Sequence, residues 1–260
     1  MVSSVLIIIP AHNEETRIGN TLKSYSDFFE KLKENNVLNY EISVIINNTK
    51  DNTEEVVKTA KKQNENITYL NFKQGGKGFA VVEGFKDALK KPYDLIGFVD
   101  ADMATPPEAF YKLITSLGSA DCTIASRGLS QSKVETSTKR KITSWGFNFL
   151  LRSILLLPIK DTQCGAKLFT RNAVSSVLTN LSITAWAFDI DLLYTLRKKG
   201  FRIKEIPTTW YDISGSKIRG MFRVILQMFL SIIRLRLMYS PFKRFIKLYD
   251  SLPEQIKIHH

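Results

Sequence analysis

The sequence predicts an α/β protein in which helices flank both faces of a mostly parallel sheet. Four strand-like apolar runs each precede an amphipathic helix, and these units recur at intervals of roughly 25 residues, as in nucleotide-binding α/β proteins. The chain has 260 residues, of which 44% are hydrophobic, so it can bury one large core. Such sheets bind ligands beyond the carboxyl ends of their strands, which is where functional residues are expected.

The strand and helix units follow one another along the chain. Short apolar and β-branched runs predict strands at residues 5–9, 41–46, 67–70, 95–99 and 122–126. The helix after the first strand carries an apolar stripe of Ile18, Leu22, Tyr25, Phe28, Phe29 and Leu32. The helices after the second and third strands carry Val56, Val57 and Ala60, and Val81, Val82, Phe85 and Leu89. A further helix is predicted at 106–117, after the fourth strand.

The fourth strand leads into two aspartates, Asp100 and Asp102. Residues i and i+2 of an extended chain point to the same side, so both carboxylates can converge on one cation. Oxygen ligands suit a hard divalent cation such as Mg²⁺ or Mn²⁺, which could neutralise a substrate diphosphate. The alternative is that the two acids only solvate a turn, and this short pattern alone does not decide between the two.

A glycine-rich turn at residues 75–78, GGKG, opens the helix after the third strand. Glycine lets the backbone approach a phosphate closely, and Lys77 adds positive charge. The spacing of a P-loop is absent, so a helix-entry turn without a ligand is an equally good interpretation.

Charge and cysteine content narrow the class of partner and the compartment. The formal net charge of +12 and the pI near 9.6 indicate an anionic partner, which could be nucleic acid, a membrane surface or a phosphorylated substrate. The two cysteines, Cys122 and Cys164, do not form a disulfide framework and fit a reducing compartment. No export signal is expected from residues 1–10, so we predict a protein on the cytoplasmic face of a membrane.

Two segments combine basic and apolar residues. Residues 136–160 and 213–249 contain Lys and Arg but no acid, beside long apolar runs. The uncharged run 224–233 is too short to cross a bilayer, which needs about 20 residues, but it can lie in an anionic membrane surface. Packing on the protein's own core is the alternative. Nucleic acid is disfavoured because the basic residues adjoin long aliphatic runs rather than exposed aromatic residues suited to base stacking.

Three motifs in order resemble the family 2 glycosyltransferases, whose catalytic domain has the GT-A fold. They are PAHNE at residues 10–14, GKG at 76–78 and DAD at 100–102. Further motifs are similar to the dolichyl-phosphate β-glucosyltransferases: DTQCGAKLFTR at 161–171, FDIDLLY at 188–194, Ile206-Pro207 with Trp210, and GSK at 215–217. Dolichyl-phosphate mannose synthases share the first half. The resemblance covers residues 5–218, and its 161–165 block is the most specific part.

This resemblance implies a site in three parts. The nucleotide-sugar would be bound by Pro10, Ala11, Glu14, Asn47, Lys77, Asp100, Ala101 and Asp102, with Asp100 and Asp102 also holding Mg²⁺ or Mn²⁺. Acceptor phosphate or donor diphosphate would be bound by Arg127, Arg140, Lys217 and Arg219. Asp102, Arg127 and Asp189 are the predicted catalytic residues; Asp189 would be a base only for a hydroxyl acceptor. A favourable acid at a helix N-terminus is the alternative for Asp189 and Asp191.

Two positions depart from the family pattern. Asn47 stands where the family commonly has paired aspartates, which weakens any inference about the nucleotide base. Ala104 stands where mannose synthases often have a glutamine, which favours the glucosyl branch.

The resemblance implies transfer, with inversion at the sugar carbon, of glucose from UDP-glucose to dolichyl or another polyprenyl phosphate. Alternatives are mannose transfer from GDP-mannose, a glycan-extending transferase with a sugar hydroxyl acceptor, and a non-catalytic membrane adaptor. We predict a catalytic domain over residues 1–216 and a basic amphipathic helical region over 217–260. The catalytic domain includes a membrane-facing amphipathic segment near 138–159.

Overall fold

The computed structural model describes most of the chain up to residue 211 and a short part beyond it. The described residues are 3–136, 146, 148, 151–179, 181, 187–211, 229–230, 232–237 and 240.

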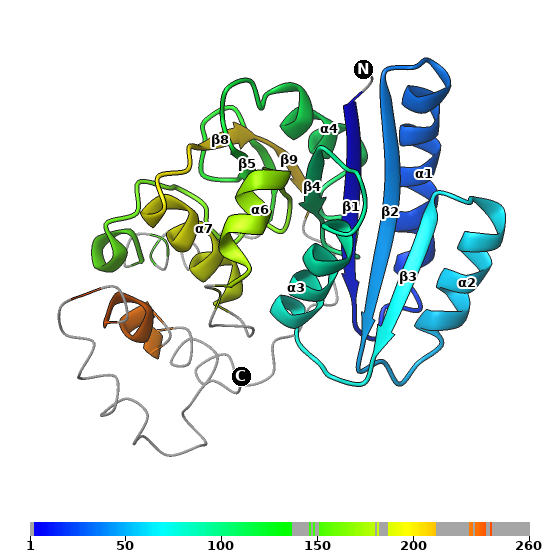
Figure 1. Cartoon of the computed structure of the whole chain (residues 1–260), viewed down its shortest axis with the longest axis horizontal. Coiled ribbons are helices and arrows are strands. Elements are labelled where there is room, and N and C mark those ends of the chain that lie inside the picture. Colours follow the sequence, from blue (N-terminus) through cyan, green and yellow to red (C-terminus); the bar gives the residue numbers. More distant parts are fainter. Residues whose placement is uncertain are drawn as a thin grey trace.

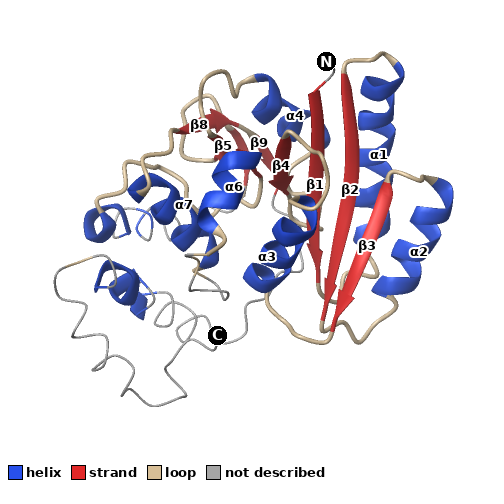
Figure 2. Ribbon diagram, viewed as in Figure 1, coloured by secondary structure: helices blue, strands red, loops and turns tan. Residues whose placement is uncertain are grey.

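Within these residues, seven strands form one sheet in the order β3-β2-β1-β4-β7-β5-β8 (Figures 1 and 2). Their bounds are β1 Ser3–Ala11, β2 Leu38–Asn47, β3 Ile67–Phe72, β4 Leu95–Phe98, β5 Cys122–Ser126, β7 Lys167–Thr170 and β8 Ile203–Pro207. Strand β7 is antiparallel to both of its neighbours, whereas the remaining pairs are parallel. A separate two-stranded sheet pairs β6 (Lys133–Glu135) with β9 (Thr209–Tyr211). The predicted mixed, mostly parallel sheet is confirmed.

Helices cover both faces of the large sheet. Their bounds are α1 Ile18–Glu34, α2 Thr53–Gln63, α3 Lys77–Ala88, α4 Pro107–Thr115, α6 Arg171–Val177 and α7 Phe188–Lys198. Alternate residues of β1 enter two different core clusters. Ile7 packs with side chains of α1, α2 and α4, and Ile8 packs with side chains of α3, α6 and α7. A strand buried on both faces explains why residues 5–9 read as a continuous apolar run.

Several predicted bounds need correction. Strand β1 is longer than residues 5–9, β2 begins before residue 41, and the helix predicted at 106–117 is α4, Pro107–Thr115. Strand β4 ends at Phe98, so Asp100 and Asp102 lie in the turn that follows it rather than at its extended end. Strand β7 was not predicted from the alternation of apolar and polar residues, because it has four residues and begins with a lysine.

Parts of the two basic apolar segments pack inside the protein. Leu151, Leu155, Ile232 and Leu235 are at most 2% exposed and belong to the core cluster formed with α3 and α7. For these side chains, the alternative prediction of packing on the protein's own core is correct. Three residues of the apolar stripe predicted to lie in the membrane surface, Phe222, Ile225 and Met228, are outside the described residues, as is most of 138–150. Among the helices described, none is both long and apolar enough to span a membrane.

Candidate active site

The carboxyl ends of three adjacent strands form one edge of the sheet. Strand β1 pairs with β2 on one side and with β4 on the other, so the residues that follow these strands are neighbours. Pro10 and Ala11 end β1, Asn47 ends β2, and the Asp100–Asp102 turn follows β4. This arrangement brings together most of the predicted nucleotide-sugar residues.

Asn47 fixes two of the loops at this edge. Its side chain is buried; Nδ2 donates to the Ala11 carbonyl at 3.0 Å, and Oδ1 accepts from the Gly76 amide at 3.0 Å. The amide therefore ties the end of β1 to the glycine-rich turn before α3. A carboxylate at this position could not donate to the Ala11 carbonyl, so this link depends on the amide of Asn47.

Glu14 lies on the loop between β1 and α1. Its amide donates to Thr53 Oγ1 at 2.7 Å, and its carboxylate forms a two-bond pair with Arg17. Burial raises the pKa of Glu14 although Arg17 acts the other way, and repulsion from Asp102 and Asp100 adds to the rise. Glu14 therefore lies within the electrostatic field of the two aspartates.

Asp100 and Asp102 differ in their surroundings. Lys77 Nζ lies 2.6 Å from Asp100 Oδ1, and Asp102 Oδ1 accepts from the Ala104 amide at 3.0 Å. Burial opposes ionisation of Asp100, but Lys77 outweighs it and keeps the pKa below its usual value. Burial and repulsion from Asp100 raise the pKa of Asp102. A cation between the two carboxylates would relieve this repulsion.

The donor set fits a divalent metal ion. Both aspartates supply oxygen ligands, and Asp100 already holds the ammonium group of Lys77, so this position accepts positive charge. Among the described residues, no group of three or more His, Cys, Asp or Glu side chains is arranged to hold a metal. Two carboxylates suit a Mg²⁺ or Mn²⁺ ion that takes its other ligands from water and substrate phosphates.

Gly165 forms the wall against which Asp100 packs. A Cβ added at Gly165 would lie 1.8 Å from Asp100 Oδ2 and 2.3 Å from Asp100 Cγ. These distances are far below van der Waals contact, so the position of the carboxylate requires a residue without a side chain. The segment 161–165, the most specific part of the sequence resemblance, therefore contacts a predicted metal ligand directly.

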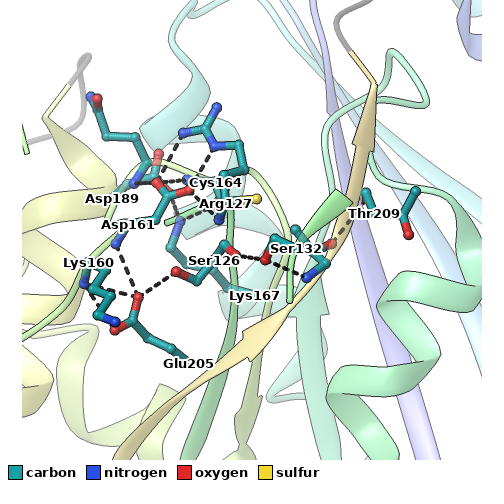
Figure 3. A network of polar contacts seen from close by, with 12 residues as sticks. Ser126, Arg127, Ser132, Lys160, Asp161, Cys164, Lys167, Asp189, Glu205 and Thr209 are labelled. Carbon is teal, nitrogen blue, oxygen red and sulfur yellow. Dashed lines mark hydrogen bonds and ion pairs between the residues drawn. The ribbon is translucent and has the colours of Figure 1, made fainter. Parts of the chain in front are cut away.

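Arg127 is held by Asp161 from the same segment (Figure 3). Arg127 Nε and Nη2 donate to the two Asp161 oxygens at 2.7 and 3.0 Å, and the Arg127 amide donates at 2.9 Å. The guanidinium carbon lies 5.1 Å from the centre of the Trp210 ring. Burial opposes ionisation of Asp161, but Arg127 outweighs it and lowers the pKa. Arg127 is thus fixed in one orientation beside the sheet edge.

Asp189 lies between two lysines in the first turn of α7. Lys167 Nζ is 2.6 Å from Asp189 Oδ1 and 2.6 Å from the Cys164 carbonyl, and Lys77 Nζ is 3.7 Å from Asp189 Oδ2. The Lys167 side chain is fully buried. Asp189 thus lies at the N-terminal end of a helix, and its carboxylate is engaged by two ammonium groups.

Sequence reasoning assigned no role to four residues that shape the site. Asp161, Gly165 and Lys167 lie within the motif at 161–171, and Glu205 lies outside every motif. Glu205 accepts from Ser126 Oγ at 2.6 Å and from the amides of Lys160 and Asp161 (Figure 3). A lysine inside an apolar strand was an available signal for Lys167; Glu205 offered none.

Three predicted residues lie outside the described part of the chain. They are Arg140, Lys217 and Arg219, and their binding to acceptor phosphate or donor diphosphate stays a prediction.

This edge of the sheet therefore brings together a carboxylate pair, a glycine-rich turn and an oriented arginine. A family model described as Glycosyl transferase family 2 matches residues 6–178, and the chain belongs to this family.

Relatives in the family have consistent names. The chain is 34% identical over 245 residues to the dolichyl-phosphate beta-glucosyltransferase of Dictyostelium discoideum, covering 90% of this chain and 74% of that protein. The proteins of the same name from Saccharomyces cerevisiae and Homo sapiens are 31% and 32% identical, each covering 82% of this chain and 68% of the relative. The predicted resemblance to this branch is confirmed.

Solved structures confirm the fold. Glucosyl-3-phosphoglycerate synthase from Mycobacterium tuberculosis in complex with uridine diphosphate has a TM-score of 0.67 at 15% identity, covering 92% of this chain and 82% of that chain. Another structure of that enzyme, with Mn²⁺, uridine diphosphate and phosphoglyceric acid, has a TM-score of 0.67 at 16% identity, covering 90% and 78%. The shared architecture is the GT-A fold that the sequence predicted.

Replacement of Gly165 by alanine tests the contact with Asp100. We expect the Gly165→Ala variant to fold but to bind Mn²⁺ about tenfold or more weakly, because the new methyl group displaces the carboxylate. Titration calorimetry measures the affinity. Gly146→Ala is the matched control, since a Cβ there meets nothing within 4 Å. Equal Mn²⁺ affinities in the two variants would contradict the proposed contact.

The ion pair between Asp161 and Arg127 predicts a pH dependence of stability. Because the folded pKa of Asp161 is lowered, its contribution is complete above the unfolded value near 3.9 and is lost as the pH falls through the folded value. Asp161→Asn should cost about 3 kcal/mol of unfolding free energy at pH 7, and this difference should shrink below about pH 4.

Urea unfolding of both proteins at pH 7 and pH 3 measures this difference. Asp27→Asn is the control: the Asp27 side chain is 58% exposed in its pair with Lys23, so its loss should cost less than about 0.5 kcal/mol. A cost for Asp161→Asn that stays constant with pH would show that the ion pair is not its source.

Proposed function

We propose that this protein transfers glucose from UDP-glucose to dolichyl phosphate, or to a closely related polyprenyl phosphate, with inversion at the sugar carbon. The observation that carries the proposal is the segment 161–165. Through Asp161 it orients Arg127, and through Gly165 it contacts Asp100, so acceptor-side and donor-side groups adjoin one short loop. The names of the relatives supply the sugar and the lipid.

The donor end of the site is assigned to the carboxylate pair. Asp100 and Asp102 would hold Mg²⁺ or Mn²⁺, the ions present with uridine diphosphate in solved structures of a protein with the same fold. The bound ion supplies positive charge that stabilises the diphosphate as it leaves. We assign Ala11, Glu14 and Lys77 to nucleotide-sugar binding. Two observations support this: Lys77 pairs with Asp100, and Asn47 joins the end of β1 to the glycine-rich turn.

The acceptor end of the site is assigned to Arg127. A phosphate monoester has a second pKa near 6, so it is largely dianionic at neutral pH and needs no general base. It needs a cation that holds it in line with the sugar carbon. Arg127 suits this task because Asp161 fixes its orientation through two hydrogen bonds. Asp189, which ammonium groups already engage, then need not act as a base.

The alternatives make different demands on the same residues. GDP-mannose as donor finds no support among the names of the relatives, which specify glucose. A sugar hydroxyl acceptor would require Asp189 as a base and would not require Arg127. A non-catalytic adaptor would not need the carboxylate pair.

The acceptor determines where the enzyme works. Each buried methylene of a prenyl tail is worth about 0.8 kcal/mol, so the lipid stays in the bilayer and the protein must come to it. We propose peripheral or monotopic binding to an anionic membrane surface on the cytoplasmic side, through the basic residues of 138–159 and 217–260. The excess of Lys and Arg over acids in the sequence supports this placement.

A transfer assay tests the proposed reaction. Purified protein, polyprenyl phosphate and Mn²⁺ are incubated with labelled UDP-glucose or GDP-mannose, and we expect lipid-linked glucose to form. Asp102→Ala should lower the rate about a thousandfold while the circular dichroism spectrum stays unchanged, because diphosphate departure loses its metal. Glu55→Ala is the control, since that side chain is 70% exposed.

Each alternative has its own outcome in this assay. Lipid-linked mannose would identify the GDP-mannose enzyme. Donor hydrolysis without lipid-linked product, normal in Arg127→Lys and strongly reduced in Asp189→Asn, would indicate a hydroxyl acceptor. Absence of both transfer and donor hydrolysis would favour the adaptor.

Vesicle flotation tests the membrane proposal. Replacing three basic residues, Lys243, Arg244 and Lys247, by glutamine should weaken binding to vesicles with anionic phospholipid about 100-fold, because each charge near the surface is worth about 1 kcal/mol. Substitutions are preferable to deletion, since Ile232 and Leu235 lie in the core. Equal binding of both proteins, or equal binding to neutral vesicles, would contradict an electrostatic attachment.

A further inference from the structure

Four charged side chains form a continuous series of ion pairs beside the carboxyl ends of the strands. In order they are Asp100, Lys77, Asp189 and Lys167. Lys77 Nζ lies 2.6 Å from Asp100 Oδ1 and 3.7 Å from Asp189 Oδ2, and Lys167 Nζ lies 2.6 Å from Asp189 Oδ1. Both ammonium groups lie over the Phe98 ring, at 5.8 and 5.3 Å from its centre. Lys77 is therefore shared between two carboxylates that stand on either side of it.

Lys77 is paired with Asp100, one of the two carboxylates that would bind a metal ion. An ammonium group at 2.6 Å from Asp100 Oδ1 and a divalent cation on that same oxygen would repel each other strongly. Mg²⁺ binds oxygen ligands at about 2.0–2.1 Å, which leaves no room for the ammonium group on the same side of the oxygen. Lys77 must therefore leave Asp100 Oδ1 when a cation binds.

Asp189 is positioned to receive the displaced ammonium group. Its Oδ2 is already within ion-pair range of Lys77, and its Oδ1 is fixed by Lys167. Lys167 cannot swing away, because its side chain is fully buried and its Nζ also donates to the Cys164 carbonyl at 2.6 Å. The receiving carboxylate is thus held in place by a second, immobile lysine.

Core stability alone does not account for Lys167. An apolar side chain of similar volume usually stabilises a core as well as a buried ion pair does. A fixed Asp189 next to a shared lysine, by contrast, serves the donor site.

We propose that Lys77 exchanges partners when the donor site is loaded, from Asp100 in the donor-free protein to Asp189 in the metal-bound protein. Asp189 and Lys167 are then positioning residues that keep the receiving site ready. The inference rests on the proposed function in one respect, namely that Asp100 binds a divalent cation. It adds that the cation competes with a lysine of the same chain, and that Asp189 favours the cation by accepting this lysine.

Mn²⁺ affinity, measured by titration calorimetry without nucleotide or acceptor, tests the exchange. Lys77→Met should bind Mn²⁺ about fivefold more tightly than the wild-type protein, because the competing ammonium group is gone. Asp189→Asn should bind about fivefold more weakly, because Lys77 then stays on Asp100. In the double variant the Asp189→Asn change should have little effect, since no lysine needs a new partner.

The double variant separates exchange from a general change in local charge or in folding. Additive effects of the two substitutions would overturn the exchange, even if the transfer assay still yields lipid-linked glucose. A lower Mn²⁺ affinity in Lys77→Met would overturn it as well. Glucose transfer by a wild-type protein that binds no Mn²⁺ would refute both the metal role in the proposed function and the exchange. Thermal melting of each variant confirms that the folded protein is being titrated.

Discussion

The geometry of the site depends on the buried carboxylate of Asp161. This side chain, 3% exposed, accepts the backbone amide and the guanidinium group of Arg127. It also accepts the amides of Gln163 and Cys164, at 3.2 and 3.1 Å. One group therefore joins the end of β5 to the loop before β7. Gly165 follows Cys164 directly and contacts Asp100. A shift of Asp161 would therefore displace both Arg127 and the carboxylate of Asp100.

The buried and partly buried charged groups around this loop bond to its backbone. Glu205 accepts the Lys160 and Asp161 amides, and Lys167 donates to the Cys164 carbonyl. Burying such groups costs free energy unless their hydrogen bonds are made, and here they are made to the same short segment. The result is an irregular loop whose backbone is fixed at several points. Such preorganisation suits a reaction in which two phosphate groups must be held on opposite sides of one sugar carbon.

Local sequence patterns predicted most strands of the sheet and the pair Asp100 and Asp102. They did not predict features that depend on contacts between residues remote in the sequence. The apolar runs identified β1 to β5, and the spacing of Asp100 and Asp102 after β4 identified the carboxylate pair. Strand β7 is short, begins with the buried Lys167 and runs antiparallel, so neither its length nor its pattern indicated it. The bond between Glu205 and Ser126 spans 79 positions, and only the folded chain shows it.

The described apolar residues of the two basic apolar segments pack on the same face of the sheet as α3 and α7. Leu151, Leu155, Ile232 and Leu235 pack in the core cluster that contains side chains of α3 and α7. The same two helices carry Lys77 and Asp189 in their first turns, next to Asp100. Apolar residues of both segments are thus anchored on the face from which the charged groups approach the donor carboxylates.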